Sequence, residues 1–262
     1  MTTYEDLILE KKDGIATVTL NAPDKMNALT VGIRKSLRQV SDDLAADDDV
    51  RVVIVTGAGR GFCAGGDLSG GGAAEPTRQQ LIEFLGPDHG AHAFFTLDKP
   101  VIAAVNGACV GAGLSLALSA DIRIASEVAR FGAVFVLRGF SPDCGITYWL
   151  PRTVGIARAL ELMFTGDIID AAEAKRLGIV SRVVPPDDLM KAARELADRI
   201  AQQAPFSVEL TKRMVYRGLR DGWDRQVEVE TIANRITAQT EDHREAVRAF
   251  FEKRPQPKFM GR

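Results

Sequence analysis

The chain has 262 residues, 46% of them hydrophobic, so it is long enough to bury a large core without a disulfide or a metal. Its formal net charge of -2 argues against a general affinity for nucleic acid. Cys63, Cys109 and Cys144 lie far apart without C-x-x-C spacing, so we expect reduced thiols, no metal site and a cytoplasmic protein. No apolar run suits a signal peptide or a transmembrane helix, so no membrane partner is expected.

The N-terminal part alternates β-prone runs with one long helix. Apolar runs at residues 7–10 and 15–20 flank an Asp-Gly pair, which is typical of a β-hairpin turn. Thr30 is the expected N-cap of a helix that continues to about Ala46, because apolar residues recur on one face at helical spacing. A buried strand is predicted over residues 52–55.

The middle of the chain predicts a parallel sheet, and the C-terminal part predicts helices. Strands over residues 101–105 and 122–125 enclose a helix over residues 111–120, which is the succession of an α/β fold. The other predicted elements are helices over residues 77–96, 144–152, 156–165, 171–177, 186–203, 208–217, 226–238 and 241–253, a strand over residues 179–184 and an extended arm over residues 254–259.

Two strand-to-helix junctions rich in small residues carry the strongest functional signal. Residues 57–68 follow the first parallel strand, and residues 106–113 follow the second. Small residues let a ligand approach the backbone, and N–H groups at a helix start attract negative charge. Neither junction matches a phosphate loop or G-x-G-x-x-G. The pair predicts two converging N–H donors, an oxyanion hole; the alternative is two ordinary turns of an α/β protein.

Six short motifs occur in a fixed order along the chain. They are Asn-Ala-Pro-Asp-Lys-Met-Asn-Ala-Leu at 21–29, Gly-Phe-Cys-Ala-Gly-Gly-Asp-Leu at 61–68, Lys-Pro-Val-Ile-Ala-Ala-Val-Asn-Gly at 99–107, Phe-Thr-Gly at 164–166, Ala-Ala-Glu-Ala at 171–174 and Gly-Ile-Val at 178–180. Together they resemble the enoyl-CoA hydratase/isomerase (crotonase) superfamily. The resemblance implies an α/β fold, a crotonase-like spiral of ββα units over residues 1–200. It further implies a helical trimerisation region over residues 201–262, and trimers that pair into hexamers.

The resemblance also implies an acyl-CoA substrate, no separate cofactor, and particular site residues. The backbone N–H groups of Gly66 and Ala112 are expected to hold the thioester carbonyl and to stabilise an enolate. Ala112 stands where many relatives have Gly, and Gly113 is expected to open space beside it. The other expected substrate-binding residues around the CoA channel are Lys25, Met26, Ala28, Ala64, Asp67 and Leu68.

The acid residues distinguish between members of the family. Its hydratases add water with two Glu residues, at positions where this chain has Ser115 and Phe135, which we expect to contact the acyl group instead. Asp143 remains, within a Pro142–Arg152 segment that resembles the epoxyphenylacetyl-CoA isomerases. This implies an isomerase in which one carboxylate moves a proton. The alternatives are an N-cap role for Asp143, a hydratase or other lyase, and a non-catalytic CoA-ester- or RNA-binding member.

Other residues have weaker assignments. We expect Asp121 to form structural pairs and Trp149 to lie in the core. Lys212 and Lys258 are expected in solvent or, alternatively, on CoA phosphates, and Phe259 is a candidate to reach a neighbouring subunit. Residues 69–95 are expected to shape the acyl pocket.

Overall fold

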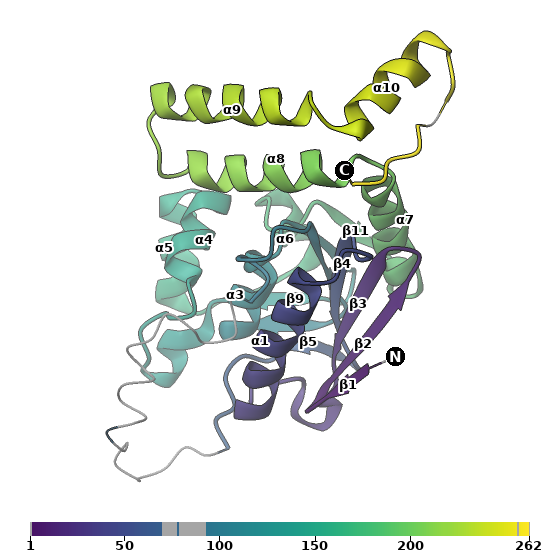
Figure 1. Ribbon diagram of the computed structural model, residues 1–262. Coiled ribbons are helices and arrows are strands. Elements are labelled where there is room, and N and C mark those ends of the chain that lie inside the picture. The colour runs from purple at the N-terminus through teal and green to yellow at the C-terminus, as the bar shows by residue number, and fades with distance from the viewer. Residues whose placement is uncertain (1, 70–77, 79–92, 256, 262) are drawn as a thin grey trace.

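The computed structural model describes residues 2–69, 78, 93–255 and 257–261. Two sheets with surrounding helices form the N-terminal part, and α8 and α9 lie side by side across one end of the molecule (Figure 1). The α/β fold predicted from the sequence is confirmed. The helix predicted over residues 77–96 and the expected acyl-pocket segment 69–95 lie mostly outside the described residues, and residues 93–96 form turns and a bend.

The larger sheet contains the predicted hairpin and the predicted parallel strands. Its order is β1-β2-β3-β4-β6-β8-β11, with antiparallel pairing from β1 to β3 and parallel pairing beyond. Strands β4 and β6 bury apolar side chains on both faces, as parallel strands covered by helices do. The strands are β1 (Thr2–Tyr4), β2 (Leu7–Lys12), β3 (Ile15–Leu20), β4 (Val52–Gly57), β6 (Val101–Val105), β8 (Ile122–Ser126) and β11 (Arg182–Val184).

A second sheet includes a short strand from each junction, where no strand was predicted. It has the order β10-β9-β7-β5 and consists of β5 (Gly61–Cys63), β7 (Ala108–Val110), β9 (Arg130–Gly132) and β10 (Ile168–Asp170). Each strand has three residues, too few to show the alternation by which strands are recognised in a sequence. Each junction therefore runs from the larger sheet into the smaller one, which is the ββα arrangement that the resemblance implied.

The helices follow the predicted pattern with shifts of a few residues at their ends. Helix α1 (Val31–Ala45) begins at the Thr30 cap, whose hydroxyl oxygen accepts a hydrogen bond from Ile33 N at 3.0 Å. All residues of α3 (Ala112–Ser119) are buried. The others are η1 (Pro23–Lys25), η2 (Val134–Arg138), α4 (Ile146–Val154), α5 (Ile156–Thr165), α6 (Ala171–Arg176), η3 (Pro186–Asp188), α7 (Leu189–Ala201), α8 (Pro205–Gly218), α9 (Trp223–Thr237) and α10 (Glu241–Phe251). No helix in the described part of the chain is long and apolar enough to cross a membrane.

Helix α3 rests directly on strand β5. A Cβ built at Gly113 would lie 2.1 Å from the carbonyl oxygen of Cys63. Side chains do not fit at that distance, so Gly113 sets the spacing between the helix and the strand. The side of Gly113 on which a Cβ would stand is filled by the Cys63 backbone, and its role in opening space beside Ala112 stays a prediction.

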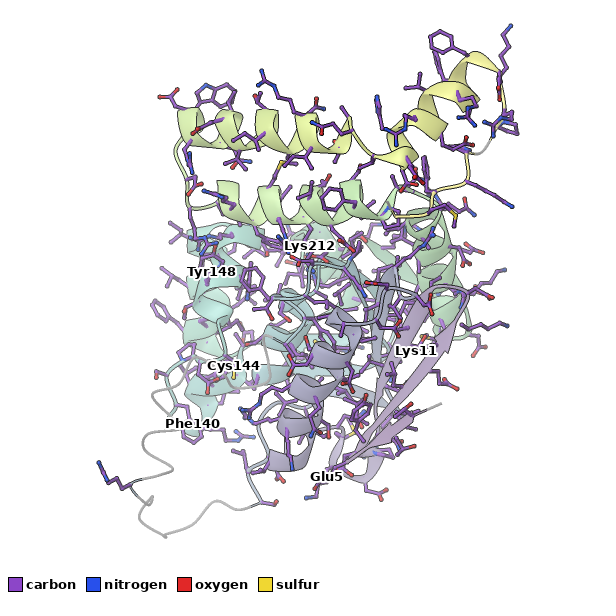
Figure 2. The ribbon with its side chains drawn as sticks, in the orientation of Figure 1. Glu5, Lys11, Phe140, Cys144, Tyr148 and Lys212 are labelled. Carbon is purple, nitrogen blue, oxygen red and sulfur yellow. The ribbon has the colours of Figure 1, made fainter. Side chains whose placement is uncertain are left out.

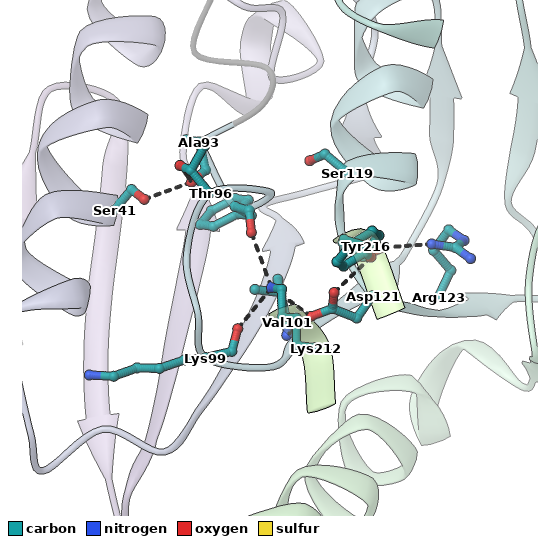
Figure 3. A network of polar contacts seen from close by, with 12 residues as sticks. Ser41, Ala93, Thr96, Lys99, Val101, Ser119, Asp121, Arg123, Lys212 and Tyr216 are labelled. Atoms are coloured by element: carbon teal, nitrogen blue, oxygen red, sulfur yellow. Dashed lines mark hydrogen bonds and ion pairs between the residues drawn. The ribbon is translucent and has the colours of Figure 1, made fainter. Parts of the chain in front are cut away.

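A buried polar network attaches α8 to the larger sheet (Figure 3). Lys212 Nζ lies 2.8 Å from Asp121 Oδ2 and donates hydrogen bonds to two backbone carbonyls, at 3.3 and 3.0 Å. Asp121 also accepts hydrogen bonds from Val101 N at 2.7 Å and from the Tyr216 hydroxyl at 2.8 Å. The structural pairing expected of Asp121 is present, but Lys212 is not solvated: its side chain is 7% exposed and burial lowers its pKa.

The predicted C-terminal arm turns back to the core. Arg51 Nη2 donates a hydrogen bond to the carbonyl oxygen of Phe259 at 2.8 Å. The buried Asp242 carboxylate accepts hydrogen bonds from Met260 N at 2.6 Å and Gly261 N at 2.9 Å. These contacts place the arm beside residues distant in the sequence.

Replacing Gly113 by Ala should lower the free energy of unfolding by about 1–3 kcal/mol, because the methyl group overlaps Cys63 O and forces α3 away from β5. Urea unfolding measures this loss. At Gly222 an added Cβ meets no atom of the described residues within 4 Å, so Gly222→Ala should lower the free energy of unfolding by less than about 1 kcal/mol, the N-cap preference for Gly. Equal losses of unfolding free energy in the two variants would contradict the close contact between Gly113 and Cys63 O.

Replacing Lys212 by Met should lower the free energy of unfolding by about 3 kcal/mol, because Asp121 loses its cation in a largely buried position. The exposed Lys191 on α7 is the control, and its Met variant should change the free energy by less than about 0.5 kcal/mol. Thermal or urea unfolding distinguishes the two, and a Lys212→Met variant as stable as the parent would argue against the network.

Candidate active site

The two small-residue junctions touch each other through their backbones. Gly65 has a φ of +97°, and a Cβ built on it would lie 3.0 Å from Val110 O and 3.5 Å from Ala112 N. The second junction is fixed by a hydrogen bond from Gly111 N to Gly132 O at 2.8 Å. The predicted convergence of the junctions is therefore present, because glycine leaves room for main chain to meet main chain.

The two predicted donors, Gly66 and Ala112, flank this contact. Ala112 is the first residue of α3, where N–H groups have no acceptor within the helix. Within the described residues, neither the Gly66 N–H nor the Ala112 N–H donates a hydrogen bond. Among the residues that the structure describes, a Cβ built on Gly66 would have Arg34 Nη2, at 3.6 Å, as its one neighbour within 4 Å. Both donors can therefore receive a ligand oxygen, although binding of a thioester carbonyl stays a prediction.

Asn27 holds the first junction in place. Its side chain is 0% exposed, and its Oδ1 accepts a hydrogen bond from Ala22 N at 2.9 Å. Its Nδ2 donates to Ala58 O at 2.9 Å and to Gly61 O at 2.8 Å. One amide thus joins the 21–29 segment to both ends of the turn that precedes β5. Asn27 was not among the residues predicted for the site, although its place in a Pro-containing turn was a signal.

The predicted CoA-channel residues come from segments that lie together. Met26 O accepts a hydrogen bond from Ala64 N at 3.0 Å, and Lys25 Nζ lies 3.3 Å from Asp67 Oδ2. Hydrogen bonds from Ser69, and then Lys25, lower the pKa of Asp67 to about 2. Of the remaining residues of this set, Ala28 is buried and the side chain of Leu68 is 54% exposed. Their contact with CoA stays a prediction.

Ser115 and Phe135 lie close to the second junction. Ser115 is one turn beyond Ala112 on α3 and is 0% exposed, and its Oγ has no hydrogen-bond partner among the described residues. Phe135 is 9% exposed on η2, and its neighbour Val134 contacts Gly111, with Cγ2 3.7 Å from a Cβ built there. Neither side chain titrates near neutral pH, so neither can shuttle a proton as Glu does.

Asp143 does not cap helix α4. The N-cap is Gly145 and no side chain caps this helix, which removes the alternative role for Asp143. The exposed Asp143 carboxylate adjoins the thiol of Cys144, a buried residue that is labelled in Figure 2, and it contributes to the raised pKa of that thiol. Burial and then Asp143 raise the pKa of Cys144 to about 12, and Arg34 opposes this rise.

Arg34 connects the Gly66 junction with the Asp143–Cys144 pair. Its Nε donates a hydrogen bond to Leu29 O at 3.2 Å, its Nη2 lies beside Gly66, and its guanidinium interacts with the Cys144 thiol. Arg34 was not among the residues predicted for the site. The available signal was its position one turn after the Thr30 cap, which directs it toward the 21–29 motif.

The remaining assignments concern the core around α8. Trp149 is 8% exposed and packs edge-on against Phe95, with ring centroids 4.7 Å apart, so the predicted core position is correct. A cavity of about 690 Å³ between α7 and α8 is lined by Asp121, Lys212 and Tyr216 among others, and by none of the predicted site residues. No group of three or more His, Cys, Asp or Glu gathers as a metal site in the part of the chain that the structure describes.

Known proteins resemble this chain over nearly its whole length. A family model described as enoyl-CoA hydratase/isomerase matches residues 10–262. The chain is 40% identical over 258 residues to the short-chain-enoyl-CoA hydratase of Clostridium acetobutylicum, covering 98% of each chain. It is 36% identical over 263 residues to the 1,2-epoxyphenylacetyl-CoA isomerase of Escherichia coli, covering 98% of this chain and 99% of the relative.

The fold is shared as well. The crystal structure of an enoyl-CoA hydratase from Bacillus anthracis matches with a TM-score of 0.91 at 33% identity, covering 98% of this chain and 100% of that one. Both the sequence and the arrangement of ββα units agree with these relatives. The chain therefore belongs to the enoyl-CoA hydratase/isomerase family.

Proposed function

We propose that this protein isomerises acyl-CoA thioesters, with Gly66 and Ala112 as the oxyanion hole and Asp143 as the residue that carries a proton. Membership of the family supports an enoyl-CoA hydratase/isomerase activity. The choice of an isomerase over a hydratase rests on the residues around the second junction. At the positions that the resemblance assigns to the two hydratase acids this chain has the buried Ser115 and Phe135. Asp143 offers an exposed carboxylate next to Cys144, whose thiol interacts with Arg34.

The proposed reaction needs one carboxylate and no water. Asp143 takes the proton from the α-carbon of a 3-enoyl thioester, and the electron pair moves to the carbonyl oxygen. The backbone N–H groups of Gly66 and Ala112 stabilise the resulting dienolate, an effect that typically contributes about 100–1000-fold per donor. Asp143 then returns the same proton to the γ-carbon, which gives the 2-enoyl isomer and restores the carboxylate. Opening of a ring epoxide through an enolate is a related possibility for the same groups.

A hydratase is the second candidate. It is favoured by the name of the 40% identical relative, a short-chain-enoyl-CoA hydratase. Hydration of a 2-enoyl thioester requires one group to take a proton from water and another to deliver a proton to carbon. Asp143 would have to perform both steps, which makes hydration slower than isomerisation in this site.

Replacing Asp143 by Asn should lower kcat for 3-enoyl-CoA isomerisation by at least about 100-fold, because the amide cannot accept the proton. KM should change by less than about threefold, since the thioester and CoA contacts remain. Absorbance of the conjugated 2-enoyl product follows the reaction, and mass spectrometry reports any addition of water. The exposed Asp187 on η3 provides the control, and Asp187→Asn should match the parent.

Two outcomes would contradict the proposal. One is an Asp143→Asn variant that isomerises at the parent rate. The other is a parent enzyme that adds water to 2-enoyl-CoA faster than it moves the double bond, which would establish the hydratase instead.

Replacing Ser115 by Ala should raise the free energy of unfolding by about 1 kcal/mol, because it removes a buried hydroxyl without a partner. We expect the bound acyl group to satisfy this hydroxyl, so KM should rise about fivefold. Ser119 on the same helix is the matched control, since its Oγ donates to Leu116 O at 2.8 Å. Ser119→Ala should lower stability by about 1 kcal/mol and leave KM unchanged. A less stable Ser115→Ala variant with the parent KM would contradict this role.

A further inference from the structure

We propose that Arg34 is a third component of the oxyanion site, whose guanidinium stabilises the enolate electrostatically from beside Gly66. This inference rests on the proposed function, because it concerns charge that forms on the thioester oxygen. Three structural features support it: how the side chain is anchored, where its charge lies, and which neighbouring groups that charge affects.

The anchoring comes from the start of α1. Leu29 forms a β-bridge with Gly66, and the next residue, Thr30, caps the helix. Arg34 lies one turn later, its backbone N donates to Thr30 O at 3.0 Å, and its Nε donates to Leu29 O at 3.2 Å. The guanidinium is therefore tied to the same residue that pairs with the junction, and it points back toward the helix start.

The charge lies close to the predicted oxyanion. Arg34 Nη2 is 3.6 Å from a Cβ built on Gly66. The N and Cβ atoms of one residue are about 2.5 Å apart, so Nη2 lies within about 6 Å of the Gly66 N. An oxygen that accepts a hydrogen bond from this N at about 2.9 Å lies within about 9 Å of Nη2. At such distances a unit charge changes the stability of an anion by about 10- to 100-fold near a protein surface. The thioester oxygen is uncharged before proton removal and charged afterwards, so the effect falls on kcat rather than on KM.

The same charge already acts on groups around the site. Arg34 opposes the rise in pKa that burial causes at two thiols, Cys63 in strand β5 and Cys144 next to Asp143. A cation that favours anions at both of these positions is well placed to favour an enolate between the two junction residues and the acid. The family's backbone donors would then act together with a side-chain charge.

The test uses acetoacetyl-CoA, whose acidic α-carbon ionises to an enolate with its own near-ultraviolet absorbance. The enolate fraction of the bound ligand is measured at one fixed pH for the parent, Arg34→Gln, Arg34→Met and Arg34→Lys. The control is Lys35→Gln, which removes one charge from the exposed side of the same helix. A CoA thioether without the carbonyl, which cannot ionise, reports binding and the integrity of the site.

We expect the ionisation constant of the bound ligand to fall by about 10- to 100-fold in both neutral Arg34 variants, together with kcat for isomerisation. Binding of the thioether and KM should stay within about threefold, the Lys variant should recover part of the loss, and Lys35→Gln should match the parent. A neutral variant that ionises the ligand as the parent does would overturn the role of Arg34. A parent protein that does not promote ionisation at all would overturn the oxyanion hole itself, and with it the proposed function.

Discussion

Direct contact between main chains is the constraint on which the candidate site depends. Cβ atoms built at Gly57, Gly107 and Gly113 would lie 2.3, 2.0 and 2.1 Å from backbone oxygens of the segment 60–63. No side chain fits at such distances, so the absence of side chains sets the separation of the two junctions. The smaller sheet then continues this contact as pairing between β5 and β7. A site built from backbone N–H groups requires this arrangement, because the donors are only as well placed as the chain segments that carry them.

The periodic elements were predictable because burial imposes a pattern on their sequence. The apolar run of β6 and the capped, one-sided helix α1 agree with the structure to within a residue or two. The three-residue strands of the smaller sheet were not predicted, since their stability comes from pairing between distant segments and leaves no local pattern. The motifs predict that Gly66 and Ala112 belong to one site because the resemblance spans the chain. Neither junction alone supports that prediction.

Contacts that side chains make across the site could not be predicted from the sequence. Asn27 and Arg34 appear in the sequence as an ordinary turn residue and a surface base, and their importance follows from partners dozens of residues away or on another element. Lys212 shows the same limit, since only the packing of α8 on the sheet reveals its buried ion pair. The CoA contacts of Lys258 and Phe259, the trimer or hexamer and the division near residue 200 stay predictions. The side chains of Trp223, Phe250 and Phe251 on the C-terminal helices are exposed.

The environment of Cys144 has a consequence for the chemistry that the site can tolerate. An α,β-unsaturated thioester is a Michael acceptor, and a thiolate beside it would add to its β-carbon and become alkylated. Burial, and then the Asp143 carboxylate, hold the pKa of the Cys144 thiol far above neutral pH, so the thiol stays protonated there. Burial and the adjacent carboxylate thus protect the protein from its own electrophilic ligand, and the same protection would make cysteine-directed covalent inhibitors ineffective at this position.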